Sequence, residues 1–221
     1  MKPLYWTVPP DWKGETGYII AGGISVLNQD ISKLQGRHVV VVNSAYEATP
    51  WADYLFFGDE RWWYDHRKRP EILKFKGRFV TPSQAAVGNN LLRLWRYTPN
   101  LDLKRGKLGP GLTTNPMAVV SQRTSLQGAM NLVAHFGVSR MVLLGADMCR
   151  GENGATHHHK PHKWQNKPGN KTWDMQMDQL VLIVEPLRAL GVEVLNASPI
   201  SRIPWWPKVN FEDTLSNVVC P

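Results

Sequence analysis

The sequence predicts a doubly wound α/β domain, in which helices cover both faces of a mostly parallel sheet. Two observations support this fold class: short apolar runs recur along the 221 residues, and helical patterns with glycine-bearing joints separate them. The clearest run, 38–43, is rich in β-branched valines, as expected for a strand that is buried on both faces. We therefore expect one Rossmann-like domain over residues 1–221, without internal repeats or low-complexity linkers.

The elements expected in the first half follow from apolar runs and the residues that flank them. Strands are predicted at 18–21, 38–43, 54–57 and 77–81, a helix from 25 to about 34, and a partly helical stretch at 60–75. The first strand ends in Gly22-Gly23, which permits a tight turn, and Ser25 or Asn28 is a suitable cap for the helix that follows.

The second half contains one indistinct region and one long loop. Within 84–122 a strand is predicted at 91–97, and 104–116 is rich in Gly, Pro and Lys, as loops are. Clear patterns then predict helices at 124–137 and 173–190 and strands at 140–147 and 192–196. The polar, histidine-rich segment 147–172 is too long for a routine connection, so we expect an active-site loop there. The tail 199–221 is expected to be irregular but to dock through its apolar residues.

Composition narrows the partners and the compartment. The net charge of +8 predicts an anionic partner, and the basic residues are spread along the chain, which favours nucleotide phosphates or an acidic acceptor over nucleic acid. No run approaches the roughly 18 apolar residues of a membrane span, and no secretory signal is visible. Cys149 and Cys220 show no pairing pattern. These features predict a cytoplasmic protein.

Small, amide and acidic residues follow the predicted strands. In an open parallel sheet, ligands bind beyond the carboxyl ends of the strands, where the strand order reverses. A glycine turn lets the backbone approach a phosphate, and the N–H groups of a helix start favour an anion. The residues at these ends are Gly22, Gly23, Ser25, Asn43, Ser44, Asp59, Asp147, Asn196 and Ser198. Asp59 is equally suited to contact a ligand or to cap the next helix.

Two common nucleotide-binding signatures are missing from the chain. The turn after the first strand lacks the full G-x-G-x-x-G fingerprint, and no Walker pattern with its Lys-Ser/Thr pair occurs. This argues against nicotinamide-dependent redox chemistry and against P-loop hydrolysis.

A family resemblance rests on the segment in which Thr124-Ser125 opens a helix, Gly137 ends it, and Gly145-Ala146-Asp147 ends the next strand. This order resembles the bacterial sialyltransferases of glycosyltransferase family 42, which carry Thr-Ser-Gly, a helix, Leu-Gly and a strand ending Gly-x-Asp. Residues 194–201 are similar to the family's segment near the end of its sheet. The resemblance covers roughly 18–58 and 121–203, and the same scheme occurs in phage and prophage proteins and, more distantly, in pterin diphosphokinases of the MptE type.

The resemblance implies a donor site. Ser25, Asn43 and Ser125 would contact the donor nucleotide, and Gly22 and Gly23 would give backbone access. With the strand-end Asp147, these residues make up the predicted nucleotide-binding set.

The chain departs from the family at four places. The family has an Asn at Gly22 and a Pro at Ile24. Its donor-phosphate tyrosine falls at Cys149, and its catalytic histidine falls near Trp173-Asp174, where this chain has no histidine. These departures affect the transfer chemistry more than nucleotide binding.

The histidines of the long loop offer a replacement base. A histidine could take the proton from an acceptor hydroxyl, and Asp174 could do the same or orient a histidine. Two alternatives stay open: a metal site that uses these imidazoles with Asp147 and Cys149, or a solvated loop that happens to be histidine-rich. The metal site lacks an H-E-x-x-H or Cys-x-x-Cys signature, so we predict none. The catalytic candidates are His157, His159, His162 and Asp174.

The sequence thus predicts a nucleotide-sugar-dependent glycosyltransferase, similar to the sialyltransferases, that transfers a sugar from a CMP or similar donor to a glycan or other hydroxyl acceptor without a cofactor. The first alternative is a magnesium-dependent diphosphokinase of the MptE type. The second is a non-catalytic phage protein, located in the cytoplasm of a bacterial host, that keeps the nucleotide-binding fold.

Overall fold

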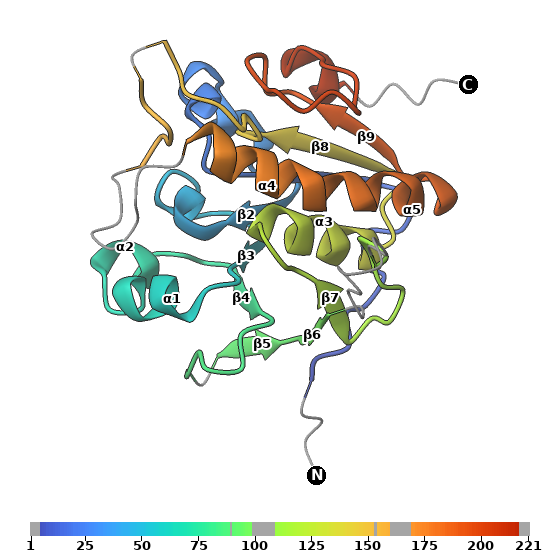
Figure 1. Cartoon of the computed structure of the whole chain (residues 1–221). Helices are drawn as coiled ribbons and strands as arrows, with labels where there is room; N and C mark the ends of the chain where they lie inside the picture. The colour runs from blue at the N-terminus through green and yellow to red at the C-terminus, as the bar shows by residue number, and fades with distance from the viewer. Residues whose placement is uncertain (1–4, 89, 99–108, 153, 160–168, 217–221) are drawn as a thin grey trace.

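A seven-stranded sheet in which every strand pairs in parallel forms the centre of the molecule (Figure 1). The computed structural model describes residues 5–88, 90–98, 109–152, 154–159 and 169–216. The strand order is β5-β4-β3-β2-β1-β8-β9. The strands are β1 (Thr16–Ile20), β2 (His38–Val42), β3 (Tyr54–Phe56), β4 (Arg78–Thr81), β5 (Leu91–Arg93), β8 (Arg140–Leu144) and β9 (Glu193–Asn196). The predicted α/β fold class, a mostly parallel sheet flanked by helices, is confirmed.

The run predicted as one strand at 91–97 is divided between two sheets. Residues 91–93 form β5, whereas β6 (Trp95–Tyr97) pairs with β7 (Ala118–Val120) in a separate two-stranded sheet. The division falls at buried Leu94, whose N–H still donates to Thr81, while the N–H of Trp95 donates to Met117. A change of hydrogen-bonding partner between adjacent residues leaves no trace in a hydrophobic pattern, so the single-strand prediction was wrong.

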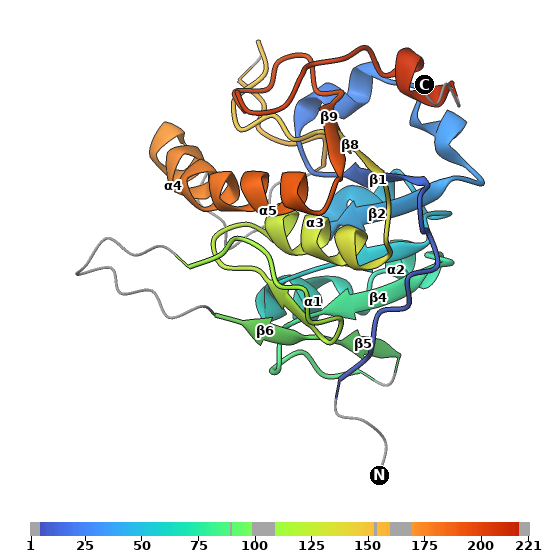
Figure 2. The same cartoon turned by 90° about the vertical axis from the view of Figure 1, so that its right-hand side faces the viewer.

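Helices cover both faces of the sheet (Figure 2). The α-helices are α1 (Glu60–His66), α2 (Pro70–Leu73), α3 (Ser125–His135), α4 (Asn170–Leu180) and α5 (Val184–Ala189). The 3-10 helices include η1 (Ile24–Asn28), η2 (Ile31–Leu34), η3 (Asn43–Glu47), η5 (Val181–Ile183) and η6 (Glu212–Leu215). The predicted helix at 173–190 is therefore interrupted. Pro186 has no N–H for the carbonyl of Leu182, which instead accepts from the N–H of Gly111 at 3.2 Å.

The helix expected from 25 to about 34 is replaced by η1 and η2. Gly23 precedes η1 without a side-chain cap, and neither Ser25 nor Asn28 caps a helix here. The N–H and hydroxyl of Ser25 both donate to the side chain of Asp147, on the other side of β1. Ser25, which the sequence suggested as a helix cap, therefore makes a tertiary contact with Asp147 instead.

The strands separate two core layers by their two-residue period. Val40 and Val42 of β2 belong to the apolar layer under α3, α4 and α5. Val39 and Val41 belong to the opposite layer, which lies under η1, η2, η3, α1 and α2. The described part of the tail after β9 packs on this framework, with Trp206 and Phe211 buried. No helix in the described part of the chain is long and apolar enough to cross a bilayer.

The strand order places the reversal point between β1 and β8. The chain builds outward from β1 through β2, β3, β4 and β5, and then continues on the other side of β1 with β8 and β9. Ligand sites of open parallel sheets lie beside such a point. Helix α3 packs closely against β3, because a Cβ on Gly128 would lie 2.4 Å from the ring of Phe56 in that strand.

Candidate active site

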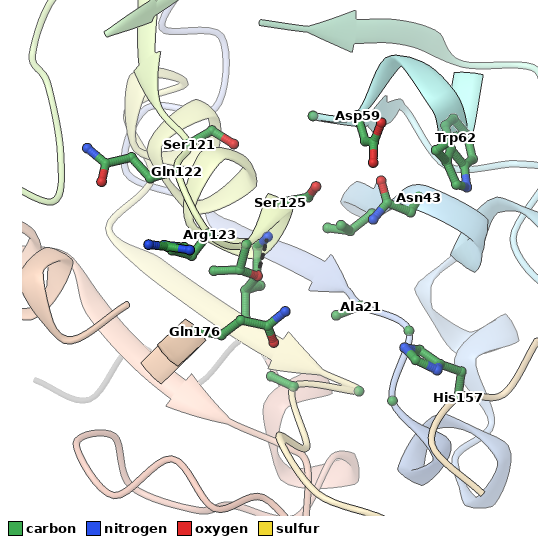
Figure 3. A pocket seen from close by; sticks show the side chains of 18 of the residues that line it. Ala21, Asn43, Asp59, Trp62, Ser121, Gln122, Arg123, Ser125, His157 and Gln176 are labelled. Carbon is green, nitrogen blue, oxygen red and sulfur yellow. Dashed lines mark hydrogen bonds between the residues drawn. The ribbon is translucent and has the colours of Figure 1, made fainter. Parts of the chain in front are cut away.

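A cavity of about 970 Å³ opens at the carboxyl edge of the sheet, beside the reversal point. The ends of β1, β2, β3, β4 and β8 line it, together with the N-terminus of α3, residues of α4 and the histidine loop, which lies beside the end of β1 (Figure 3). The structure brings seven of the predicted site residues to this cavity. They are Gly22, Gly23, Asn43, Ser125, Asp147, His157 and His159.

Asn43 has the most unusual environment of these residues. It directly follows β2 with φ at +51°, a left-handed conformation that Asn tolerates better than most residues. Its side-chain Oδ1 is buried and has no hydrogen-bond partner among the described residues. A buried carbonyl without a donor costs about 1–3 kcal/mol, so its presence at a cavity indicates a group that a ligand can satisfy.

A buried polar network supports the backbone beside Asn43. The indole N–H of Trp62 donates to the hydroxyl of Ser44 at 3.0 Å, and the indole stacks on His66 with ring centroids 4.4 Å apart. His66 also hydrogen-bonds the hydroxyl of Tyr46 at 2.8 Å. Burial raises the pKa of Tyr46, so the phenol stays neutral. His66 and Trp62 are thus packing residues, and they hold Asn43 in place.

The N-terminus of α3 faces Asn43 across the cavity (Figure 3). Thr124 caps this helix by accepting from the N–H of Leu126 at 3.2 Å. Ser125 lies opposite Gly58, where an added Cβ would come within 3.2 Å of the Ser125 Oγ. Exposed Arg123 lies at the same helix end. Helix N-termini favour anions, and a guanidinium strengthens that preference.

Arg96 joins the two walls of the cavity and was not predicted from the sequence. Its guanidinium donates to the carbonyls of Gly58, after β3, and Ser121, after β7. Burial lowers the pKa of Arg96. Arg96 lies in the region whose pattern was least distinct, and only the folding of β6 against β7 brings it to the site. Gln176 of α4 lines the cavity as well, without a sequence signal that marks it.

The turn after β1 uses its donors within the protein. Asp147 accepts from the Ser25 hydroxyl at 2.5 Å and from the Ser25 N–H at 2.9 Å, and both residues are nearly inaccessible, at 2% and 3%. Burial raises the pKa of Asp147, while the hydrogen bonds from Ser25 act in the opposite direction. Gly23 packs tightly, since a Cβ there would lie 2.4 Å from the Gly145 carbonyl. The helix-start donors that the sequence assigned to a phosphate are therefore occupied by Asp147, and Ser25 is not among the residues that line the cavity.

The loop histidines lie over the same turn. A Cβ on Gly22 would come within 3.1 Å of the His157 ring and 3.2 Å of His159 Nε2, and the two ring centroids are 4.9 Å apart. His162 lies outside the described residues.

The remaining candidates from the sequence have local partners. Asp174 forms an ion pair with Arg202 at 2.9 Å and does not line the cavity. Asp59 lines the cavity and also caps α1, where it accepts from the N–H of Arg61 at 2.8 Å, so its predicted contact with a ligand stays a prediction. The thiol of Cys149 lies 3.2 Å from the carbonyl of Ile200. Within the described residues, no three His, Cys, Asp or Glu side chains are grouped to hold a metal ion.

A parallel sheet with a strand-end cavity at its reversal point defines this protein as a Rossmann-like α/β domain, and two solved structures with a similar fold are glycosyltransferases. The MAf glycosyltransferase from Magnetospirillum magneticum aligns with a TM-score of 0.63 and 12% identity over 93% of this chain. The chain spans only 35% of that protein. The sialyltransferase CstII from Campylobacter jejuni, solved with the substrate analogue cytidine-5'-monophosphate, aligns with a TM-score of 0.53 and 12% identity over 89% of this chain and 86% of its own. No family model and no curated protein matches the sequence.

Proposed function

We propose that the protein is a nucleotide-sugar-dependent glycosyltransferase that binds its donor in the cavity at the carboxyl edge of the sheet. The observation that carries this proposal is Asn43, which combines a left-handed backbone with a buried Oδ1 that has no partner among the described residues, and which lies across the cavity from Ser125 at the start of α3 (Figure 3). A nucleotide would complete this arrangement. A hydroxyl or amino group of the nucleoside would donate to Asn43, and a phosphate would lie at the start of α3, beside Ser125 and Arg123.

CMP is the nucleotide that the fold comparison favours. The sialyltransferase with a similar fold was solved with cytidine-5'-monophosphate, and a CMP-sugar is therefore the donor that we propose. The positively charged chain and the helix N-terminus both suit the phosphate of such a donor.

The transfer step needs a base and a stabilised leaving group. As the acceptor oxygen attacks the anomeric carbon, His157 or His159 would take the hydroxyl proton. The bond between that carbon and the phosphate oxygen breaks, and the nucleotide leaves with the electron pair. Asp174, which is paired with Arg202 outside the cavity, is a weaker candidate for the base. The mechanism that we propose uses no metal ion, because the start of α3 and Arg123 neutralise the phosphate.

A magnesium-dependent diphosphokinase is favoured less by the strand-end carboxylates. That chemistry requires carboxylates that are available to a cation, but Asp59 is engaged by Arg61 and Asp147 by Ser25. A non-catalytic phage protein that retains nucleotide binding is the other alternative. Cys149 at the family's tyrosine position and the lack of a histidine at 173–174 would be consistent with it.

Calorimetric titration with CMP in EDTA tests the proposal. We expect CMP to bind without metal, and Asn43→Ala to weaken binding at least tenfold, which is about 1.4 kcal/mol. Ser125→Ala should weaken it less, because the helix N-terminus remains. Asn28→Ala is the matched control, since Asn28 is exposed at the end of η1 and does not line the cavity.

Each alternative predicts a different result. Binding of ATP only with magnesium would favour the diphosphokinase. Binding of CMP without any hydrolysis or transfer from a CMP-sugar would favour the non-catalytic protein. A lack of response to all nucleotides would refute the donor site.

A further inference from the structure

The loop histidines alternate in their surroundings. The rings of His157 and His159 line the cavity above Gly22, whereas His158 does not line it. This alternation resembles that of an extended strand, in which every second side chain points to the same side. It leaves His158 on the protein side of the loop.

His158 fastens the loop to the end of β1 by two contacts. Its backbone N–H donates to the carbonyl of Gly22 at 3.1 Å. Its ring also has the backbone of Ala21 beside it, which acts as a hydrogen-bond acceptor toward the imidazole and raises its pKa against the effect of burial. The two accepting carbonyls are therefore consecutive, at the point where β1 ends.

The second ring nitrogen of His158 shows which form of the ring is held. Its Nε2 is buried and has no hydrogen-bond partner among the described residues. The bond to Ala21 must therefore come from the other nitrogen, Nδ1, which carries the proton. Burial lowers the pKa of His158 and so favours this neutral form.

We propose that His158 is a positioning residue, which clamps residues 155–159 onto the end of β1 and thereby holds His157 and His159 side by side over Gly22. That these two rings then serve sugar transfer rests on the proposed function. The clamp itself does not, because it consists of contacts within the free protein.

Three consecutive histidines therefore have two different roles. An imidazole that both anchors a loop and stays uncharged is suited to positioning. The neighbouring rings, 4.9 Å apart at the cavity, are close enough to contact one ligand. Fixing the loop at residue 158 sets the position of both neighbours at once, since each is one residue away.

Two substitutions of His158 distinguish the effect of its ring hydrogen bond from the effect of side-chain size. In His158→Asn the amide nitrogen can occupy nearly the place of Nδ1 and can still donate to Ala21. In His158→Gln the amide reaches the place of Nε2 and misses that carbonyl. We therefore expect Asn to preserve the clamp and Gln to release it. His38→Gln is the matched control, because His38 pairs with Glu15 at the amino end of β2, away from the cavity.

Nuclear magnetic resonance on the ligand-free protein gives the direct measurement. In His158→Gln, hydrogen exchange of the residue-158 amide should become about tenfold faster, as expected for loss of a hydrogen bond, and the ring signals of His157 and His159 should shift. His158→Asn and His38→Gln should leave the exchange rate and both ring signals unchanged. Equal behaviour of the Asn and Gln variants, or unchanged rings in the Gln variant, would overturn the proposal.

Titration of the same proteins with CMP distinguishes this proposal from the proposed function. If the wild-type protein does not bind CMP, the donor site is refuted, whereas the ring and exchange data still decide the role of His158. If CMP binds and the Gln variant releases the rings, we expect its rate of sugar transfer to fall at least tenfold with little change in CMP affinity. The Asn variant should restore that rate.

Discussion

The turn after β1 and the region between the end of β2 and the start of α3 contain similar kinds of residues, but their polar side chains differ in whether the protein supplies a hydrogen-bond partner. Each combines a buried strand, small or amide residues and the start of a helix. At the β1 turn, the donors of Ser25 are satisfied by Asp147. Across the cavity, the Oδ1 of Asn43 is left without a partner in the described residues, and the start of α3 points into open space. A strand-end motif is therefore open to a ligand only where the protein itself does not fill it.

The sheet explains this difference. β8 lies directly beside β1, with Leu144 in register with Ile20, so the residues after the two strands meet. Asp147 consequently reaches the donors of Ser25. The residue after β3 that faces α3 is Gly58, which has no side chain to fill the space before Ser125. One half of the site is therefore structural, and the other half is open to the donor that we propose.

The largest effect on stability should come from removing the carboxylate of Asp147, which accepts the hydrogen bonds of Ser25 at the turn after β1. Asp147→Ala would leave buried donors of Ser25 without a partner, and we expect the free energy of unfolding to fall by about 3 kcal/mol. Urea denaturation measures this change. A loss below about 1 kcal/mol would mean that water or a rearranged loop satisfies these donors, and the distinction between the two halves would fail.

At the binding half, stability and affinity should change in opposite directions. Asn43→Gly removes the unpartnered carbonyl and relieves a left-handed residue, so we expect the protein to become more stable by about 1 kcal/mol. The affinity for CMP should still fall at least tenfold. Thermal denaturation and calorimetry on the same sample check both signs. A variant that is less stable than the wild-type protein would show that Asn43 has a structural role.

The smallest expected effect is on the pH dependence of stability, and it should be seen at Asp147 but not at Asn43. Because burial raises the pKa of Asp147 above its ordinary value of 3.8, the folded state holds this proton more tightly than the unfolded state. The stabilising contribution is complete below that value and is lost as pH rises through the raised pKa. Asp147→Asn should therefore flatten the decline in stability as the pH rises above about 4, whereas Asn43→Ala should not. Parallel pH profiles for wild type and Asp147→Asn would contradict the assignment.

Much of the fold was determined by local sequence. The run 38–43 predicted β2 because buried parallel strands need apolar side chains on both faces. Helix α3 was predicted with good boundaries because Thr124 caps it and Gly137 follows it with φ at +83°. These signals act within a few residues, so they can be seen in the sequence alone.

Only the tertiary structure decided which site residues are available to a ligand. Ser25 and Asn43 are equally plausible in the sequence, but Ser25 is claimed by a carboxylate 122 positions away and Asn43 is not. Arg96 reaches the cavity only because β6 pairs with β7. Side-chain periodicity predicts where a residue is buried, whereas its hydrogen-bond partner depends on which distant strands become neighbours, and that is set by the assembly of the whole sheet.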